Sequence, residues 1–307
     1  MKLKAIPDNF LKLFGTKEAC FEQLSSIKWP KGFTCLECDR EESRMRAGRN
    51  LVRCIECRKE ISITSGTLIH HTHIPIQKMV LALFIASHGP DPISPRDLLD
   101  YGVTGRYGTA WKLCSRIRDL MKRAESSCLG GAIEADAKNT EFRSFVKGDK
   151  YKVSIVGAVE LAETIEVFSP SGSKEMTGRI RLASARSIDL IPFFLEAVEP
   201  GSIVCTRDAK EFSKLEDHSF THSPEYKSTI HNADNSLVEI RRVMEMAKEW
   251  LPATLKYKKL DEYLDEYVFR HNQGHNQDLA FQKLLKTALA KKKFRRVGGQ
   301  LGTHRFK

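Results

Sequence analysis

Two pairs of cysteines constrain this chain of 307 residues more than any other feature. The first pair is Cys35-x2-Cys38, the second is Cys54-x2-Cys57, and fifteen residues separate them. Short knuckles at this separation are typical of a site in which four thiolates surround one structural zinc ion. The sequence therefore predicts a zinc-stabilised ribbon near the N-terminus.

The residues around these cysteines are basic. They include Arg40, Arg44, Arg46, Arg49, Arg53, Arg58 and Lys59. The whole chain has 50 Lys plus Arg against 39 Asp plus Glu, which gives a formal net charge of +11. Such a surplus favours a polyanionic partner, because phosphate contacts release counterions. A basic protein that is merely soluble would have the same balance, so charge alone leaves the partner open.

Cysteine usage and hydropathy indicate an intracellular protein. The four remaining cysteines are scattered, as thiols in a reducing compartment are: Cys20, Cys114, Cys128 and Cys205. The N-terminus lacks an apolar segment with a cleavage site. The longest apolar stretch, from Met79 to Ala86, is far shorter than a bilayer span. We expect a soluble, cytoplasmic, DNA-associated protein with no membrane partner.

Periodicity and composition predict a multidomain α+β protein with four segments. Residues 1–70 combine a helical lead with the ribbon, and residues 71–127 are helical. Residues 128–290 alternate strands and helices, and residues 291–307 form a basic tail.

The helical segment has the pattern of a helix-turn-helix. After a helix over 75–87, Ser94 is an expected N-cap with Pro95 in the first turn of a short helix. A glycine-containing turn then leads to a second, basic helix that ends near Arg123. An ordinary helical hairpin would share much of this pattern.

The second of these helices supplies the candidate DNA contacts. They are Arg106, Tyr107, Lys112 and Arg116. The apolar face is expected to hold Trp111, Cys114, Ile117, Leu120 and Met121. Arg118 is expected outside that face, with the other basic residues.

Strands dominate the start of the third segment. They are predicted over 132–137, 151–160, 164–168 and 179–183. A helix over 187–198, a short strand over 202–206, a helix from about 235 to 250 and a helical region over 258–290 follow. Three antiparallel strands, a helix, a strand and a long helix have the order of a ribonuclease-H-like α/β domain.

Acidic residues stand at the ends of two of these strands. Asp136 closes the first strand, with Glu134 two residues earlier on the same face, and Asp208 follows the later strand. Ribonuclease-H topology places these two strands side by side. Together with Asn235 or Glu239 from the long helix, the two aspartates would hold Mg²⁺ or Mn²⁺ ions for phosphoryl transfer.

Each of these acids also has a simpler interpretation. An acid at the end of a strand is often a solvated turn residue. Glu239 has arginines at positions 241 and 242, either of which could hold it in a surface ion pair.

Three stretches carry a family resemblance. The first is the knuckle pair running into "ISITSGTLIHHTHIPIQKMVLALFIAS", and the second is "GTAWKLCSRIRDLM". The third combines "GAIEADAK", "PGSIVCTRDAKEF", "HNADNSLVEI" and "YLDEYVFRHNQ". In this combination, over about residues 33–290, the chain resembles the zinc-ribbon DDE transposases of the ISXO-like/Merlin superfamily of insertion sequences.

The resemblance implies a DNA transposase that binds terminal inverted repeats and performs metal-dependent strand cleavage and transfer. It implies a homodimer or higher oligomer on double-stranded DNA, because two ends must be joined. Asp136 and Asp208 fall at the first two catalytic aspartates, and the third metal ligand falls between Asn235 and Glu239.

The chain departs from the family at two of these motifs. Ala137 follows Asp136 where the family commonly has glutamate, and Val238 stands three residues after Asn235 where the family commonly has glutamate. A domesticated or inactive transposase-derived DNA-binding protein is therefore an alternative. A ribonuclease-H-like nuclease acting on RNA or hybrids is a further one.

Overall fold

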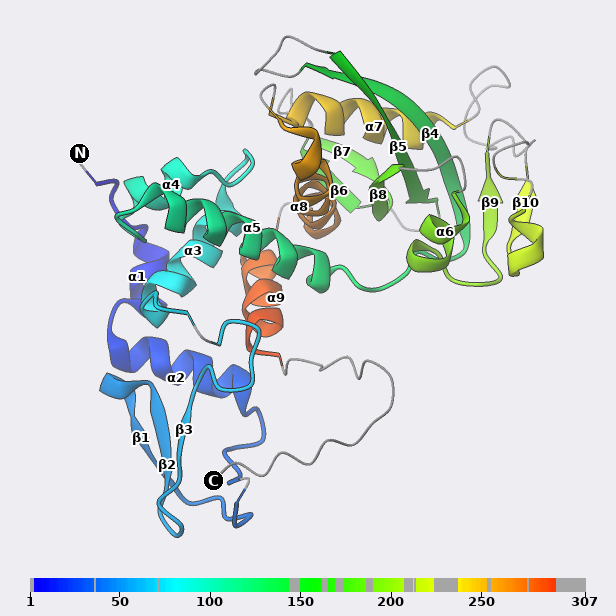
Figure 1. Cartoon of the computed structure of the whole chain (residues 1–307). Helices are drawn as coiled ribbons and strands as arrows, with labels where there is room; N and C mark the ends of the chain where they lie inside the picture. The colour runs from blue at the N-terminus through cyan, green and yellow to red at the C-terminus, as the bar shows by residue number, and fades with distance from the viewer. Residues whose placement is uncertain are drawn as a thin grey trace, which may run out of the picture.

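In the computed structural model, the chain folds into two bodies joined by long helices (Figure 1). The structure describes residues 3–290 apart from positions 36, 71, 144–149, 162–164, 169–173, 186–189, 207–211, 213, 224–236, 253–254 and 275. None of the helices in this part of the chain combines the length and the apolar composition that a membrane crossing needs.

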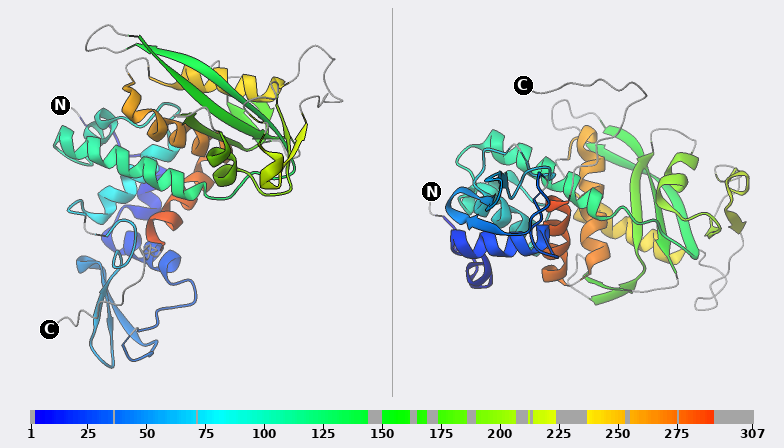
Figure 2. Two further views of the ribbon diagram at one scale, coloured as in Figure 1. Left: turned by 45° about the vertical axis from the view of Figure 1, so that its right-hand side comes forward. Right: turned by 90° about the horizontal axis from the view of Figure 1, so that it is seen from below.

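The helices and the ribbon of the first body share one hydrophobic core. The helices are α1 (Asp8–Phe14), α2 (Lys17–Lys28), α3 (Ile76–His88), α4 (Pro95–Asp100), α5 (Tyr107–Ala124) and α9 (Gln277–Leu289). The ribbon is an antiparallel sheet of β1 (Ser43–Arg46), β2 (Leu51–Cys54) and β3 (Glu60–Ser62), with the 3-10 turn η1 (Ala47–Arg49) after β1. Although α9 is the last helix in the chain, it lies against α2 and α3 (Figure 2).

The second body is built on a five-stranded sheet of order β10-β9-β4-β5-β8. The strands are β4 (Ala132–Arg143), β5 (Lys150–Glu160), β8 (Ile180–Ala185), β9 (Ile203–Cys205) and β10 (Thr221–Ser223). β4, β5 and β8 are antiparallel, whereas β9 runs parallel to β4 and β10 runs parallel to β9. A separate hairpin pairs β6 (Ile165–Phe168) with β7 (Lys174–Thr177), and η2 (Glu216–His218) is a 3-10 turn before β10.

Helices cover both faces of this sheet. α6 (Ile191–Ala197) packs on one face, where the inward residues of β4 are Ile133 and Ala135. α7 (Val238–Trp250) and α8 (Leu260–Gln273) pack on the other face, with the 3-10 turn η3 (Tyr257–Lys259) between them. The side chains of β4 that alternate with Ile133 and Ala135 therefore face α7.

The mixed α/β character agrees with the sequence expectation, but several element boundaries differ. β4 continues to Arg143, six residues beyond its predicted end. The helical region predicted over 258–290 divides into α8 and α9 because Gly274 has φ 58°, a left-handed value that glycine adopts without strain. α7 begins at Val238 rather than near 235.

The predicted start of the short helix α4 is confirmed. The Ser94 hydroxyl accepts a hydrogen bond from the Asp97 N–H at 3.2 Å, and the Asp97 carboxylate accepts one from the Ser94 N–H at 3.1 Å. This reciprocal capping box satisfies two backbone donors at the helix start, and Pro95 follows in the first turn.

Two positions on α5 differ from the expected pattern. Trp111, predicted to face inward, is 47% exposed, and Arg118, predicted to lie outside the apolar face, is only 5% exposed. The Arg118 Nε donates to a carboxylate oxygen of Glu266 on α8 at 2.8 Å. Because position 118 faces α8, a buried ion pair takes the place of an apolar contact there.

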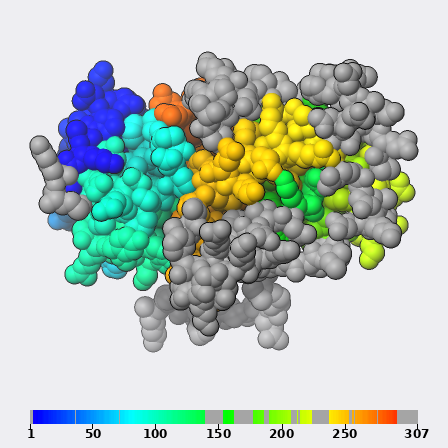
Figure 3. Space-filling model, turned by 90° about the horizontal axis from the view of Figure 1, so that it is seen from above, coloured from blue at the N-terminus to red at the C-terminus, as the bar shows by residue number. Residues whose placement is uncertain are grey.

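This ion pair joins the two bodies. The Glu266 side chain is fully buried, and it also accepts the Ile93 N–H at 2.8 Å and an N–H of Arg270 at 2.9 Å. A buried carboxylate needs such a set of donors to offset the loss of water. The network fixes α5 against α8, so α4 and α5 lie beside the body that contains the sheet, as the space-filling view also shows (Figure 3).

Candidate functional site

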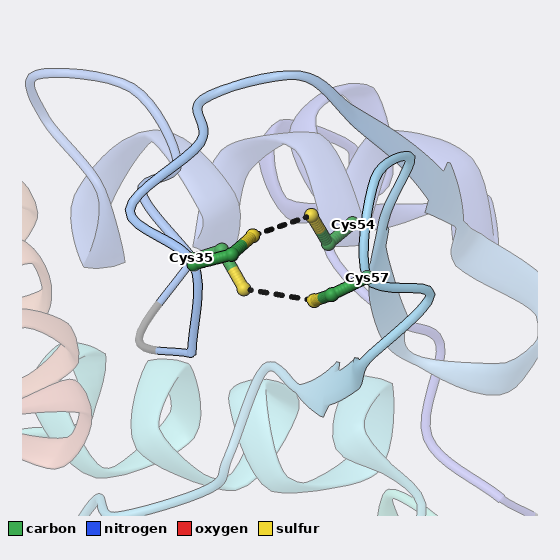
Figure 4. A group of neighbouring side chains, drawn as sticks. Cys35, Cys54 and Cys57 are labelled. Atoms are coloured by element: carbon green, nitrogen blue, oxygen red, sulfur yellow. Dashed lines mark hydrogen bonds between the residues drawn. The ribbon is translucent and has the colours of Figure 1, made fainter.

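The four predicted metal ligands come together in the ribbon (Figure 4). The sulfur atoms of Cys35, Cys38, Cys54 and Cys57 all lie within 4.8 Å of one another. The Cys35 and Cys57 sulfurs are 3.5 Å apart, and the Cys38 and Cys54 sulfurs are 3.6 Å apart. These separations are too long for disulfides, whose sulfurs are about 2.05 Å apart.

The described residues of the two knuckles share two backbone features. The Cys35 N–H donates to the Arg40 carbonyl at 2.9 Å, and the Cys54 N–H donates to the Lys59 carbonyl, five residues on in each case, at 3.0 Å. Asp39 and Arg58, each directly after the second cysteine of a knuckle, are left-handed with φ of 55° and 60°. Left-handed residues other than glycine cost on the order of 1 kcal/mol, so such a conformation persists where its surroundings enforce it.

The cysteine cluster fits a tetrahedral metal ion. A Zn–S bond of about 2.3 Å places tetrahedral sulfurs about 3.8 Å apart, close to the separations in the ribbon. Four thiolates are also the donor set that zinc prefers in structural sites. The four cysteines could therefore hold a metal ion such as zinc, which would link the two knuckles and impose their strained turns.

A lysine from α2 holds the ribbon against the helices. The Lys28 Nζ donates to the carbonyls of Ser62 at 3.0 Å, Ile63 at 2.7 Å and Ser65 at 3.0 Å. Burial lowers the pKa of Lys28 to about 8. The ammonium also lies 4.9 Å from the Trp29 ring centroid. These contacts set the direction in which the chain leaves β3.

A second cluster of functional interest lies where β4 faces α7. Asp136 and Glu134 are two residues apart on this strand, so both side chains lie on the face that α7 covers. They are 7% and 4% exposed, respectively. The Asp136 carboxylate accepts the Ala137 N–H at 2.9 Å. Two acids are therefore held at the interface of a central strand and a long helix.

Glu134 caps the N-terminus of α7. One of its carboxylate oxygens accepts the N–H of Glu239 at 2.9 Å and the N–H of Ile240 at 3.1 Å. Leu237, the N-cap residue, has φ 64° and provides no side-chain cap. The strand carboxylate therefore does the work of a capping side chain and also meets the positive end of the helix dipole.

Burial raises the pKa of the Glu134 carboxyl above its usual value. The N–H groups of Ile240 and Glu239 act in the opposite direction because they stabilise the ionised form, while the negative charge of Glu239 adds to the increase. The Glu239 carboxylate therefore lies close enough to Glu134 for the two charges to repel.

Two further contacts hold α7 along β4 and β5. The Lys138 ammonium, the next residue on this face of β4, forms an ion pair with Glu245 of α7. Between these attachments lies Gly157, the partner of Asp136 in the β4–β5 register. A Cβ at Gly157 would lie 2.9 Å from Ile240 Cδ1 and 2.6 Å from a Leu182 methyl, so a larger residue there would require these side-chain ends to shift.

The other predicted acidic-site residues have different outcomes. Glu239 is the second residue of α7, and its carboxylate pairs with Arg242, one of the two arginines that the sequence suggested. Asp208 and Asn235 lie outside the described residues. The register pairs Glu134 with Cys205, the last residue of β9, so β9 ends beside the part of β4 that carries Asp136. Asp136 was expected to close its strand but lies within it. Among the described residues, the cysteines are the only group of three or more potential ligands brought together.

The four predicted DNA contacts differ in their environment: three are exposed, and the fourth is bound within the protein. Arg106, Tyr107 and Lys112 are exposed, and Tyr107 is 62% exposed. The Arg116 guanidinium instead donates to the carbonyls of Leu68 at 3.0 Å and His70 at 3.2 Å. Arg116 therefore fastens the segment after the ribbon to α5.

Two residues of this region were not predicted from the sequence in the roles they have. Glu134 was recognised as sharing a strand face with Asp136, but nothing in the sequence indicated that it caps a helix about a hundred residues later. Trp111 is predicted to lie on the apolar face of α5. In the structure it is exposed, as is Lys112, the residue that follows it.

No protein-family model matches the chain, and no curated protein matches it. Function has therefore to be inferred from these residues and their geometry.

Replacing Cys35 with Ser should remove the bound metal. The purified chain is expected to contain about one zinc ion, and Cys35→Ser should lose most of it, because three thiolates no longer close the tetrahedron. Metal analysis together with thermal unfolding measures both effects. Cys128→Ser, which lies outside the cluster, is the control. A ribbon that stays folded without metal would contradict this prediction.

Replacing Glu134 with Ala should destabilise the sheet body. The change leaves two buried N–H groups at the start of α7 without an acceptor, at a cost of about 1–3 kcal/mol. Denaturant unfolding gives the difference in free energy of unfolding. Glu249→Ala, an exposed position on the same helix, should change it by less than about 0.5 kcal/mol. Equal effects for the two variants would rule out the capping role.

Proposed function

We propose that the chain is a DNA transposase of the DDE type. The observation that carries the proposal is the position of Asp136 in the sheet. β4, β5 and β8 are antiparallel, α6 follows, β9 returns parallel to β4, and the long helix α7 crosses the face that carries Asp136. This order of elements resembles that of a ribonuclease-H-like domain, which supports placing Asp136 and Asp208 near one another in the proposed site.

The acids at this edge suit hard divalent cations. Asp136 and Asp208, with Glu239 or Asn235, would hold Mg²⁺ or Mn²⁺, which prefer carboxylate and amide oxygens. Such ions supply charge neutralisation at the phosphorus and at the attacking and leaving oxygens. The protein's own part is to hold α7 against β4, through Glu134 and the Lys138–Glu245 pair, so that ligands from the helix and the strands meet.

In this proposal, the first body binds the DNA. Arg44 and Arg53 lie directly opposite each other in the β1–β2 register, where like charges repel. Within the part of the chain that the structure describes, neither forms an ion pair, and the same holds for Arg49 and Arg58. Unpaired guanidinium groups on a rigid ribbon favour phosphate as their partner. A zinc ion in the cysteine cluster would keep this surface folded.

An assembly of at least two chains follows from the reaction. Strand transfer that joins two element ends needs two sets of DNA contacts, so the proposal includes a homodimer or higher oligomer on double-stranded DNA. The expected location is the cytoplasm, with the protein bound to DNA.

A second candidate is a DNA-binding protein derived from a transposase and without catalytic activity. The observation in its favour is the ion pair between Glu239 and Arg242, which occupies the one described candidate for the third ligand. In that case the sheet body would be retained as a scaffold. A ribonuclease-H-like nuclease acting on RNA or hybrids is less favoured, because the helix-turn-helix suits duplex DNA.

Metal-dependent cleavage tests the proposal. The substrate is duplex DNA from the two regions that flank the coding sequence, where inverted repeats are expected. In Mg²⁺ or Mn²⁺ the wild-type chain should nick the repeat ends, and Asp136→Asn should lower the rate on the order of a thousandfold because it removes a metal ligand.

Binding of the same duplexes separates the two candidates. Asp136→Asn should still bind DNA, and Asp119→Asn, an exposed position on α5, should keep full cleavage activity. DNA binding without cleavage in either metal would favour the scaffold alternative. Cleavage that is equal in wild type and Asp136→Asn would refute the assignment of the active site.

A further inference from the structure

The carboxyl end of β9 is held by a side chain of the neighbouring strand. β10 runs parallel to β9, and the two strands lie side by side in Figure 1, with His222 opposite Val204 in their register. The Nε2 atom of His222 lies 2.8 Å from the hydroxyl oxygen of Thr206, the residue that follows β9. The imidazole therefore reaches two residues along the neighbouring strand and ties β10 to the chain just beyond the last pair of the ladder.

This contact is the one side-chain hydrogen bond of His222 within the described part of the chain. The ring is partly exposed, and its other nitrogen, Nδ1, has no hydrogen-bond partner among those residues. Thr206, by contrast, is only 2% exposed. A partly exposed imidazole can be solvated, whereas a buried hydroxyl depends on partners in the protein, so what the bond fixes is the position of Thr206.

The bond lies at the edge of the sheet where the proposed metal site is. β9 pairs in parallel with the start of β4, and its last pair lies two residues before Asp136. Val204 packs in the core with α6, so His222, its partner in the register, lies on the α6 face of the sheet. The end of β9 is therefore anchored from the face opposite to the one that carries Asp136.

We propose that His222 is a positioning residue for the metal-binding edge: by holding Thr206, it sets where the chain that leaves β9 lies relative to Asp136. The inference deepens the proposed function and rests on it, because Asp208, two residues after Thr206, is the second metal ligand in that proposal. A ligand that follows a strand of three residues is placed by whatever holds the end of that strand. Hydrogen bonds that orient the ligands of a metal ion commonly change its affinity about tenfold or more.

The simpler interpretation is that His222 only satisfies a buried hydroxyl. That role would lower the Tm of variants at this position without changing how tightly the edge binds metal. A positioning role predicts weaker metal binding at temperatures where the variant is fully folded, and recovery of the affinity when the hydrogen bond is restored.

Manganese binding to the zinc-loaded chain measures this effect without cleavage, through the electron paramagnetic resonance signal of free Mn²⁺. His222→Ala and Thr206→Val should each weaken binding about fivefold, the equivalent of one neutral hydrogen bond, and the double variant should bind no more weakly than either. His222→Gln, whose amide can reach the same hydroxyl, should recover most of the affinity. His218→Ala, at an exposed position in η2 just before β10, is the matched control and should bind as wild type does.

The outcomes separate this inference from the proposed function. Asp136→Asn should abolish the same Mn²⁺ binding, and a His222→Ala chain that then binds as tightly as wild type would refute the positioning role while the proposed function stands. Mn²⁺ binding that Asp136→Asn leaves unchanged would overturn both. In cleavage, His222→Ala should raise the half-saturating Mg²⁺ concentration in parallel with the Kd for Mn²⁺; a lower rate at saturating metal with an unchanged half-saturation would contradict the inference.

Discussion

The carboxylate of Glu134 fixes the geometry of the sheet body. It is an acid on a central strand that accepts two N–H groups at the start of α7, and it is nearly inaccessible to water. Because its donors are backbone groups, it holds the start of α7 over β4, and the exposed Lys138–Glu245 pair is a second contact further along the helix. Gly157 then allows the helix to approach closely enough to cover Asp136. Any ligand set at this edge depends on these contacts.

A buried carboxylate also joins the two bodies. The Glu266 carboxylate is fully buried and is bound by Arg118, Arg270 and the Ile93 N–H. The last helix, α9, packs in the core of the first body. Such a network holds the two bodies in one relative orientation. Moving them apart would leave a charge buried and unpaired, which is costly. The cysteine cluster could act similarly within the ribbon, where two knuckles with left-handed residues share four thiols that could hold a metal ion. If the first body binds DNA as proposed, this junction would present the DNA to the sheet in a defined orientation.

Features that depend on local chemistry could be predicted from the sequence. The cysteine spacing predicted the ligand cluster, and Ser94 and Pro95 predicted the start of α4. Features that depend on distant partners could not. Arg118 looked like a surface residue because Glu266 is 148 positions away. Trp111 is predicted to face inward, but it is 47% exposed and its ring lies against the Lys259 ammonium, which is 148 positions away. Whether Asp208 joins Asp136 remains a prediction.

Localised cleavage of the chain by bound iron tests the central claim most directly. Fe²⁺ can replace Mg²⁺ at a carboxylate site, and with ascorbate and peroxide it cuts the backbone close to where it is bound. In the zinc-loaded protein, the account predicts cuts near residues 134–138, just beyond Cys205 and at the start of α7, all suppressed by excess Mg²⁺. Cuts confined to other parts of the chain, or unaffected by Mg²⁺, would contradict a metal-binding edge at Asp136.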